Sequence, residues 1–271
     1  MRKILFVAGA LAICGFGGLI SQVMAEDRPG YTDTPMLPSG KWHVHDPNRP
    51  EPTVVTPAPT FSHGAAAPAD AIVLFDGTDL SKWQDDKGNE SKWVIHDGIM
   101  ECVPKSGYIF TKEKFGDFQL HVEWAEPAKV EGSSQGRGNS GVFLQNQFEI
   151  QVLDNYNNPT YPDGQCGAIY GQSPPLVNAC KMPDQWQTYD IIFTAARWDD
   201  HKLVSPAYVT VIQNGILVQN HQPIIGPTGH RTLGTYKHEL PATGPLALQD
   251  HGNPIRYRNI WIRNLTDEEK P

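Results

Sequence analysis

The sequence predicts an all-β fold in which two antiparallel sheets pack together as a jelly-roll sandwich. From residue 71 onward, roughly ten to fourteen short apolar or alternating segments follow one another, separated by turn signals. The 271 residues include 25 glycines and 23 prolines, which favour turns over long helices. No stretch after residue 25 keeps the 3.6-residue periodicity of an amphipathic helix. With 39% hydrophobic and 19% charged residues, the composition is that of a globular protein with a core.

Five strands are expected before residue 125. Asp97-Gly98 is a hairpin signal that joins the second strand to the third. The segment 118–124 alternates most regularly, with His121 and Glu123 directed outward and the apolar residues directed inward. The five expected strands are 72–75, 91–96, 99–103, 108–111 and 118–124.

Seven further strands are expected after a Gly/Ser-rich loop at 131–138. Asn214-Gly215 predicts a type I′ hairpin turn between two of them. The long connection 155–186 is expected to be a functional or capping loop, because compact domains seldom keep long loops otherwise. The expected strands are 139–145, 148–154, 189–194, 207–213, 216–219, 245–249 and 256–265.

The segment 148–154 is the most informative of these strands. In a regular strand Glu149 and Gln151 share one face, opposite the apolar face. A one-residue bulge near the end of the strand would return Asp154 to the face of Glu149. These polar side chains then form either a catalytic or sugar-binding patch in a cleft, or the solvated face of an edge strand. The apolar face consists of Phe148, Ile150 and Val152.

The chain before residue 71 is expected to lie outside the sandwich. Residues 1–25 have a basic start, an apolar run and an A-x-A-like end, which predicts a cleaved signal peptide and a periplasmic or secreted protein. A lipoprotein modified at Cys14 and an uncleaved membrane anchor are the alternatives. Residues 26–70 are proline-rich and predict an extended arm or linker. The sandwich is expected at 71–266, followed by a polar tail at 267–271.

The charge and the Cys and His content bear on which kinds of binding site the protein can have. The net charge of −8 and the pI of about 5.6 argue against a nucleic-acid-binding surface. Once the signal peptide is removed, no segment is expected to span a membrane. Cys166 and Cys180 close a short loop and are the plausible disulfide pair in an oxidising compartment, with small buried hydrophobes as the alternative. His43 and His45 share one side of an extended segment and could bind a metal, but a solvated arm is the simpler expectation.

Seven short motifs follow one another in order along the chain: Phe75-Asp76-Gly77-Thr78-Asp79-Leu80 with Trp83, Gly116-Asp117-Phe118, Asn139-Ser140-Gly141-Val142, Glu149-Ile150-Gln151-Val152-Leu153-Asp154, Gly167-Ala168-Ile169-Tyr170, Leu248-Gln249-Asp250-His251-Gly252 and Arg258-Asn259-Ile260. Together they resemble the 3-keto-disaccharide hydrolase family. The resemblance covers about 71–266, and it implies a concanavalin A-like jelly roll acting on glycosides whose C3 hydroxyl has been oxidised to a ketone. The chain has no dinucleotide-binding fingerprint, so a separate sugar oxidoreductase would have to supply that ketone.

The 148–154 strand also resembles the catalytic strand of laminarinase-type endoglucanases, which carries Glu-x-Asp-x-Glu. Here Gln151 stands in place of the middle acid and Asp154 in place of the last. Ordinary retaining hydrolysis needs a carboxylate pair about 5–5.5 Å apart with separated pKa values. These replacements therefore disfavour that mechanism.

Cleavage of a 3-keto-glycoside requires a base for the acidified C2 proton, a stabiliser for the enolate and an acid for the leaving group. The catalytic candidates are Glu149, His251 and Asp154, and the same three could hold one divalent ion such as calcium. Each also has a structural interpretation, as an exposed carboxylate, a structural histidine or a turn residue. The substrate-binding candidates are Gln151, Glu123, Asn139, Tyr170, Gln249 and Arg258, with Trp186 as a further stacking residue.

We therefore expect a carbohydrate-active enzyme that cleaves 3-keto-disaccharides by β-elimination and hydration. A conventional endo-β-glucanase-like hydrolase and a non-catalytic carbohydrate-binding module are the alternatives.

Overall fold

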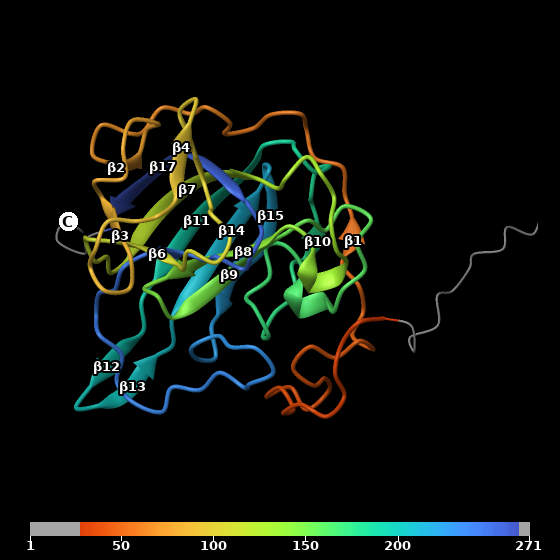
Figure 1. Ribbon diagram of the computed structural model, residues 1–271. Helices are drawn as coiled ribbons and strands as arrows, with labels where there is room; N and C mark the ends of the chain where they lie inside the picture. The colour runs from red at the N-terminus through yellow and green to blue at the C-terminus, as the bar shows by residue number, and fades with distance from the viewer. Residues whose placement is uncertain (1–27, 266–271) are drawn as a thin grey trace, which may run out of the picture.

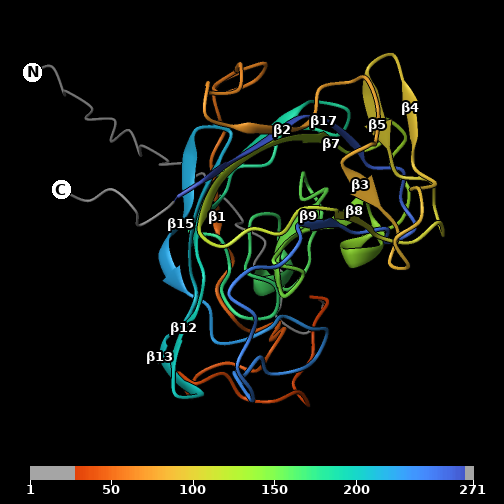
Figure 2. The same ribbon diagram turned by 90° about the vertical axis from the view of Figure 1, so that its left-hand side faces the viewer.

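Two antiparallel sheets face each other across a continuous core in the computed structural model, which describes residues 28–265 (Figures 1 and 2). This confirms the predicted two-sheet sandwich. The expected signal peptide, Cys14 and the polar tail lie outside the described residues. Within residues 28–265 there is no α-helix, and hence no helix long and apolar enough to cross a membrane.

The larger sheet has eight strands and the smaller has five, all antiparallel. The larger sheet runs β15 (Ile216–Pro223), β14 (Tyr208–Gln213), β11 (Gln187–Thr194), β7 (Phe118–Ala125), β17 (Arg256–Asn264), β5 (Ile99–Glu101) and β4 (Val94–His96), with β2 (Ile72–Phe75) paired to β17. The smaller sheet runs β3 (Trp83–Gln84), β6 (Ile109–Thr111), β16 (Ala247–Leu248), β8 (Asn139–Leu144) and β9 (Phe148–Leu153).

Five short strands were not predicted from the sequence, because two to four residues are too few to show an alternation of apolar and polar side chains. One of them, β3, belongs to the smaller sheet. The other four are β1 (Thr53–Val54), which pairs in parallel with β10 (Val177–Asn178), and β12 (Arg197–Asp199), which pairs with β13 (Lys202–Ser205). Short 3₁₀ turns occur at η2 (Ser134–Gly136) and η3 (Pro162–Gly164).

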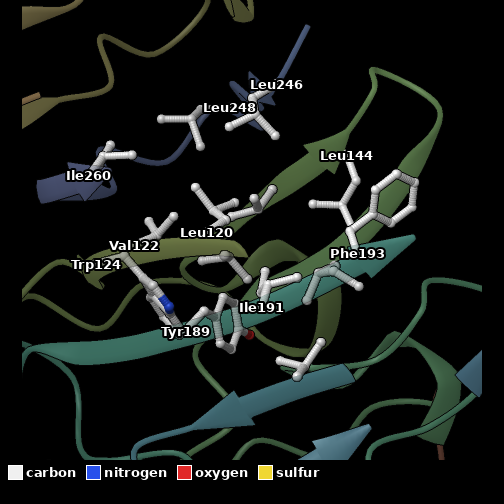
Figure 3. Close-up of a cluster of buried hydrophobic side chains, with 14 of the residues drawn as sticks. Leu120, Val122, Trp124, Leu144, Tyr189, Ile191, Phe193, Leu246, Leu248 and Ile260 are labelled. Atoms are coloured by element: carbon white, nitrogen blue, oxygen red, sulfur yellow. The ribbon is translucent and has the colours of Figure 1, made fainter. Parts of the chain in front are cut away.

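The core fills the space between the sheets, as alternation predicts. Leu120, Val122 and Trp124 on β7 are buried beside Tyr189, Ile191 and Phe193 on β11 (Figure 3). The smaller sheet contributes Val142 and Leu144 from β8 and the apolar face of β9, all buried in the same cluster. The outer face of the smaller sheet is therefore free to carry polar residues.

Strand β9 is regular throughout. Its register with β8 is unbroken from Leu144–Phe148 to Asn139–Leu153. The expected bulge near Val152 is absent, so that prediction is wrong. Glu149 and Gln151 still share the outer face, but no bulge turns Asp154 toward them.

The long connection 155–186 covers the free edge of β9. Its backbone pairs with both polar positions of that strand: Gly167 N donates to Gln151 O at 3.0 Å, and Tyr170 N donates to Glu149 O at 3.1 Å. Gln151 N in turn donates to Ala168 O at 3.0 Å. The loop thus continues the hydrogen bonding of the sheet and fixes the backbone of the polar strand on both sides.

The N-terminal segment packs on the sandwich rather than extending away from it. Val44 and Leu37 are buried, and the fully buried His45 contacts Asp163 of the long loop. The segment appears in red and orange in Figure 1, running along the same side as β1 and β10. Its burial explains how a proline-rich stretch keeps one conformation without regular secondary structure of its own.

Candidate active site

A cavity of about 720 Å³ opens on the outer face of the smaller sheet. This volume lies within the roughly 300–1,000 Å³ typical of small-molecule sites. Its lining combines β8 and β9 with η2, the loops around 229 and 250, and the N-terminal segment. The residues that line it are Pro29, Gly30, Tyr31, Tyr108, Ser133, Ser134, Gln135, Gly136, Asn139, Phe143, Glu149, Gln151, Tyr161, Tyr170, Thr228, Gly229, His230, Gln249 and His251.

The floor of the cavity carries Glu149, whose side chain is only 5% exposed. A glycine on β8 makes room for it: a Cβ at Gly141 would lie 2.3 Å from Glu149 Oε1 and 2.9 Å from its Cγ. A side chain at this position would force the Glu149 carboxyl to move. The Asn139-Ser140-Gly141 motif therefore has a steric role, since it lets the Glu149 carboxyl lie flat across the neighbouring strand.

Burial raises the pKa of Glu149 to about 8. The carboxyl is therefore mostly protonated near neutral pH, which makes it a proton donor rather than a negative charge. Strong perturbation of a carboxyl in a cavity is typical of catalytic acids.

A chain of side-chain amides connects Glu149 to the cavity wall. Gln151 Nε2 donates to Gln135 Oε1 at 2.8 Å, and Gln135 Nε2 donates to Gly164 O at 2.9 Å. In this orientation Gln151 Oε1 faces two other acceptors, Ser140 O at 3.1 Å and Glu149 Oε1 at 3.0 Å. Reversing the amide satisfies both, because Nε2 then donates to Ser140 O and to Glu149 Oε1. The Gln151 amide therefore holds the Glu149 carboxyl in place as a hydrogen-bond donor.

Aromatic side chains form the walls on both sides of this floor. Tyr170 OH is hydrogen-bonded to Tyr161 OH at 2.7 Å and to His230 Nδ1 at 3.1 Å. On another side, Tyr108 packs against Phe143 with ring centroids 5.7 Å apart. Rings and hydroxyls in this mixture suit a sugar, which has apolar C–H faces and polar edges.

Two further polar groups reach the cavity from the turn after β16. Gln249 Nε2 donates to Tyr108 OH at 2.6 Å, and Asp250 Oδ1 accepts from Gly252 N at 2.8 Å, which fixes the turn. His251 is exposed at the mouth, where partial desolvation lowers the pKa of its imidazole. His251 is therefore predominantly neutral near pH 7 and able to accept a proton.

Asn139 donates through Nδ2 to Gln135 O at 2.7 Å, and its Oδ1 lies 3.4 Å from Gln151 Nε2. Six residues singled out from the sequence thus converge on one cavity: Glu149, Gln151, Asn139, Tyr170, Gln249 and His251.

Asp154 lies outside this cavity. Arg137 Nε donates to Asp154 Oδ2 at 2.6 Å, and the pair lines a separate, smaller pocket. Without the bulge, the carboxylate points to the other side of β9. Asp154 has the contacts of a structural ion pair, and the structure does not bring it together with Glu149 and His251.

Glu123 and Arg258 lie on the outer face of the other sheet. Arg258 Nε donates to Glu123 Oε2 at 2.7 Å, and Asn259 Nδ2 donates to Glu123 Oε1 at 2.8 Å. Burial raises the pKa of Glu123, but hydrogen bonds from His121, Asn259, Gly64 and Arg258 outweigh it and lower the pKa to about 2. The N-terminal segment near Gly64 covers this cluster, since Gly64 N donates to Glu123 Oε1, so the expectation that Glu123 contacts the substrate in the cavity is not met. Trp186 stacks on the Arg258 guanidinium, with 4.0 Å between Cζ and the ring centroid, and is likewise remote from the cavity.

The three cysteines within residues 28–265, Cys102, Cys166 and Cys180, are free thiols. Cys166 and Cys180 both contact Gln213 Nε2, at 3.2 and 3.5 Å, so they are neighbours without forming the possible disulfide. No group of three or more His, Cys, Asp or Glu side chains within residues 28–265 is arranged to hold a metal ion.

Several cavity residues gave no signal in the sequence. Gln135 lies in a Gly/Ser-rich loop, Tyr108 and Phe143 read as ordinary strand aromatics, and His230 lies in a loop without a motif. Tyr31 lies in the segment that we took for a linker. The motif Leu248-Gln249-Asp250-His251-Gly252, which contains Gln249 and His251, was the only local signal for the mouth of the cavity.

Comparison with known proteins places this geometry in a family. A family described as the 3-keto-alpha-glucoside-1,2-lyase-like domain matches residues 70–263. A protein of Bacteroides thetaiotaomicron named 3-keto-disaccharide hydrolase is 26% identical over 247 residues, covering 73% of this chain and 80% of the relative.

Solved structures show the same fold. A crystal structure described as a "putative glycosyl hydrolase" from Parabacteroides distasonis is 48% identical, with a TM-score of 0.72, and the match covers 85% of this chain and all of that one. A second from the same organism is 25% identical, with a TM-score of 0.50, over 72% of this chain and 99% of that one. Since 85% of 271 residues is about 230 and residues 70–271 number only 202, the first match extends into the segment before residue 70.

Proposed function

Because the chain belongs to the family of 3-keto-alpha-glucoside-1,2-lyase-like domains, we propose that it cleaves the glycosidic bond of 3-keto-disaccharides by elimination and hydration. The main support for this proposal is one protonated carboxyl, Glu149, at the floor of a cavity that is otherwise lined by neutral amides, phenols and imidazoles. These groups suit a substrate that is already activated by a ketone at C3.

A ketone at C3 acidifies the proton on C2. A base removes that proton, the C1–O bond breaks as the C1=C2 bond forms, and the departing oxygen takes a proton from an acid. Water then adds across the C1=C2 bond, oxygen to C1 and hydrogen to C2, so that the net reaction is hydrolysis. No carboxylate nucleophile is needed at any step.

Glu149 is the acid in this scheme, since its raised pKa keeps a proton on it at neutral pH. In its reversed orientation the Gln151 amide donates through Nε2 to Glu149 Oε1 and so orients the carboxyl for transfer. After transfer, the same N–H group faces the newly formed carboxylate, which offsets part of the cost of a buried charge.

His251 is the base, because a lowered pKa leaves its imidazole neutral at the mouth of the cavity. The amides of Asn139 and Gln249 supply the N–H groups for the sugar hydroxyls and for the enolate oxygen. Tyr170 stacks on or hydrogen-bonds to the sugar from the wall. The candidate residues Asp154, Glu123 and Arg258 have no role in this proposal.

A conventional glycosidase would need a second carboxyl group across the cavity from the first. Among the described lining residues, Glu149 is the one carboxylic acid. The site therefore favours elimination over double displacement at an unoxidised sugar.

The test is to incubate the purified protein with a 3-keto-α-glucosyl disaccharide and with its unoxidised parent. We expect cleavage of the keto sugar alone, with exchange of its C2 proton with solvent deuterium, and loss of cleavage in Glu149→Gln. Glu126→Gln is the matched control, since Glu126 is a fully buried carboxyl outside the cavity. Cleavage of the parent alone would favour a conventional glycosidase, and sugar binding without turnover would favour a binding module.

We further propose that the protein is exported and that another enzyme, an oxidoreductase acting on the C3 hydroxyl, supplies its substrate. The support is the signal-like sequence at 1–25 and the requirement for a ketone. The mass of the mature chain and its recovery after cell fractionation would check the first part. Recovery of the full-length chain with the cytoplasmic fraction would contradict it.

A further inference from the structure

The N-terminal segment supplies part of the cavity wall, although it precedes the family-matched region 70–263. Pro29, Gly30 and Tyr31 line the same cavity as Glu149. The strand that carries Glu149 is thus about 120 residues away in sequence from a wall of its own site. A passive linker would not be expected to line the cavity.

Buried contacts hold this segment in place. His45 N donates to Asp163 Oδ2 at 2.9 Å, and His45 Nδ1 lies 3.1 Å from Asp163 Oδ1, with both side chains fully buried. Tyr31 N donates to His45 O at 2.8 Å, which transmits this anchoring to the cavity wall. At Gly30 a Cβ would lie 2.7 Å from His45 O, so only glycine permits the close approach.

Tyr31 is also fixed from the opposite side of the mouth. The guanidinium of Arg231 lies 4.2 Å from the centroid of the Tyr31 ring, and the ring meets His230 edge-on at 5.6 Å. Arg231 Nη2 donates to both carboxylate oxygens of Asp33 at 2.9 Å. Two segments almost 200 residues apart are therefore joined across one end of the cavity, with a half-exposed phenol ring between them.

We propose that the segment 28–46 is a substrate-binding element in which Tyr31 stacks on the second sugar ring, the one that departs as leaving group. This inference rests on the proposed function. Reaction at the keto ring is common to the family and must depend on the family-matched region. A wall from outside that region is therefore suited to the part of the substrate that varies, and an aromatic face suits a pyranose ring.

The test compares two substrates that share the keto ring. One is a 3-keto-α-glucosyl disaccharide, and the other is methyl 3-keto-α-glucoside, which lacks the second ring. Tyr31→Ala is expected to raise KM for the disaccharide about fivefold to tenfold, the range of one aromatic contact, and to leave KM for the methyl glycoside within about twofold. Tyr31→Phe keeps the ring and is expected to restore the wild-type KM.

Tyr156→Ala is the matched control, because Tyr156 is an exposed tyrosine that lines a different groove. It should change neither KM. Thermal unfolding of all variants would identify any loss of folding. Equal KM changes for both substrates in Tyr31→Ala, or none, would refute the inference alone. Cleavage of neither substrate by the wild-type protein would refute the proposed function and this inference with it.

Discussion

Replacing Glu149 by glutamine is expected to make the protein more stable while it abolishes turnover. The carboxyl has an ordinary pKa of 4.5 and a pKa of about 8 in the folded protein, because it is buried. Between these two values the folded state holds a proton that the unfolded state releases. The free energy of unfolding therefore falls as the pH rises from 4.5 to 8, by about 1.4 kcal/mol per pH unit.

At pH 7 the interval above 4.5 is 2.5 units, so the carboxyl lowers the free energy of unfolding by about 3 kcal/mol relative to pH 4. Glutamine has nearly the same shape, cannot ionise and keeps a hydrogen bond to the Gln151 amide. We expect the Glu149→Gln protein to gain about 3 kcal/mol at pH 7 and little at pH 4, which for a domain of this size is roughly 6 to 12 °C in melting temperature at pH 7.

Urea unfolding of wild type and variant at pH 4 and pH 7, fitted with a common m value, measures this difference. The same preparations should be assayed for cleavage of the keto sugar. If the variant shows the same pH dependence of stability as the wild type, Glu149 is not the buried neutral acid that the site requires. If it keeps its turnover, the assigned role of Glu149 is wrong whatever its stability.

The remaining predictions concern the space around the acid, the opposite face and the thiols. Gly141→Ala should push the Glu149 carboxyl off β8 and lower kcat at least tenfold, whereas Gly116→Ala, where a Cβ meets only ordinary contacts at 3.6 Å, should be silent in the same assay. Glu123→Ala should cost about 3–5 kcal/mol in urea unfolding at pH 7, because it leaves buried partners unpaired, yet any folded fraction should keep the wild-type KM. Since the pKa of Glu123 is lowered to about 2, its stabilisation is present above pH 4.5 and is lost as the pH falls toward 2, so the variant's stability should depend less on acid. Titration of the denatured, unreduced mature chain with a thiol reagent should find three free thiols, and a count of one would show a disulfide that the structure lacks.

Alternation along a strand was enough to predict which side chains of β9 face away from the core. Glu149 and Gln151 lie on that face because the strand is regular. The same reasoning misplaced Asp154, since a bulge depends on how the neighbouring strand pairs, and the unbroken pairing of Leu153 with Asn139 is invisible in one sequence. The local pattern was therefore enough to place Glu149 and Gln151, whereas the direction of Asp154 depended on the pairing with β8.

Alternation also identifies an outward face without saying what lies over it. Glu123 points outward from β7 as expected, but it lies on the other sheet and is covered by Gly64 and its neighbours. Arg258 follows it there as a cross-strand partner. Tyr31 could not have been found at all, because its position depends on the buried contact between His45 and Asp163, which no local pattern announces.

The loop that pairs with β9 has a consequence beyond the site. β9 is the last strand of its sheet, and without the backbone contacts from Gly167, Ala168 and Tyr170 its unpaired N–H and C=O groups would invite another chain to add a strand. The segment that holds Glu149 in position is therefore also the one that keeps two molecules from joining along this edge. Local opening of the loop should cost activity and promote self-association together, so inactivation on mild heating should be faster at higher protein concentration.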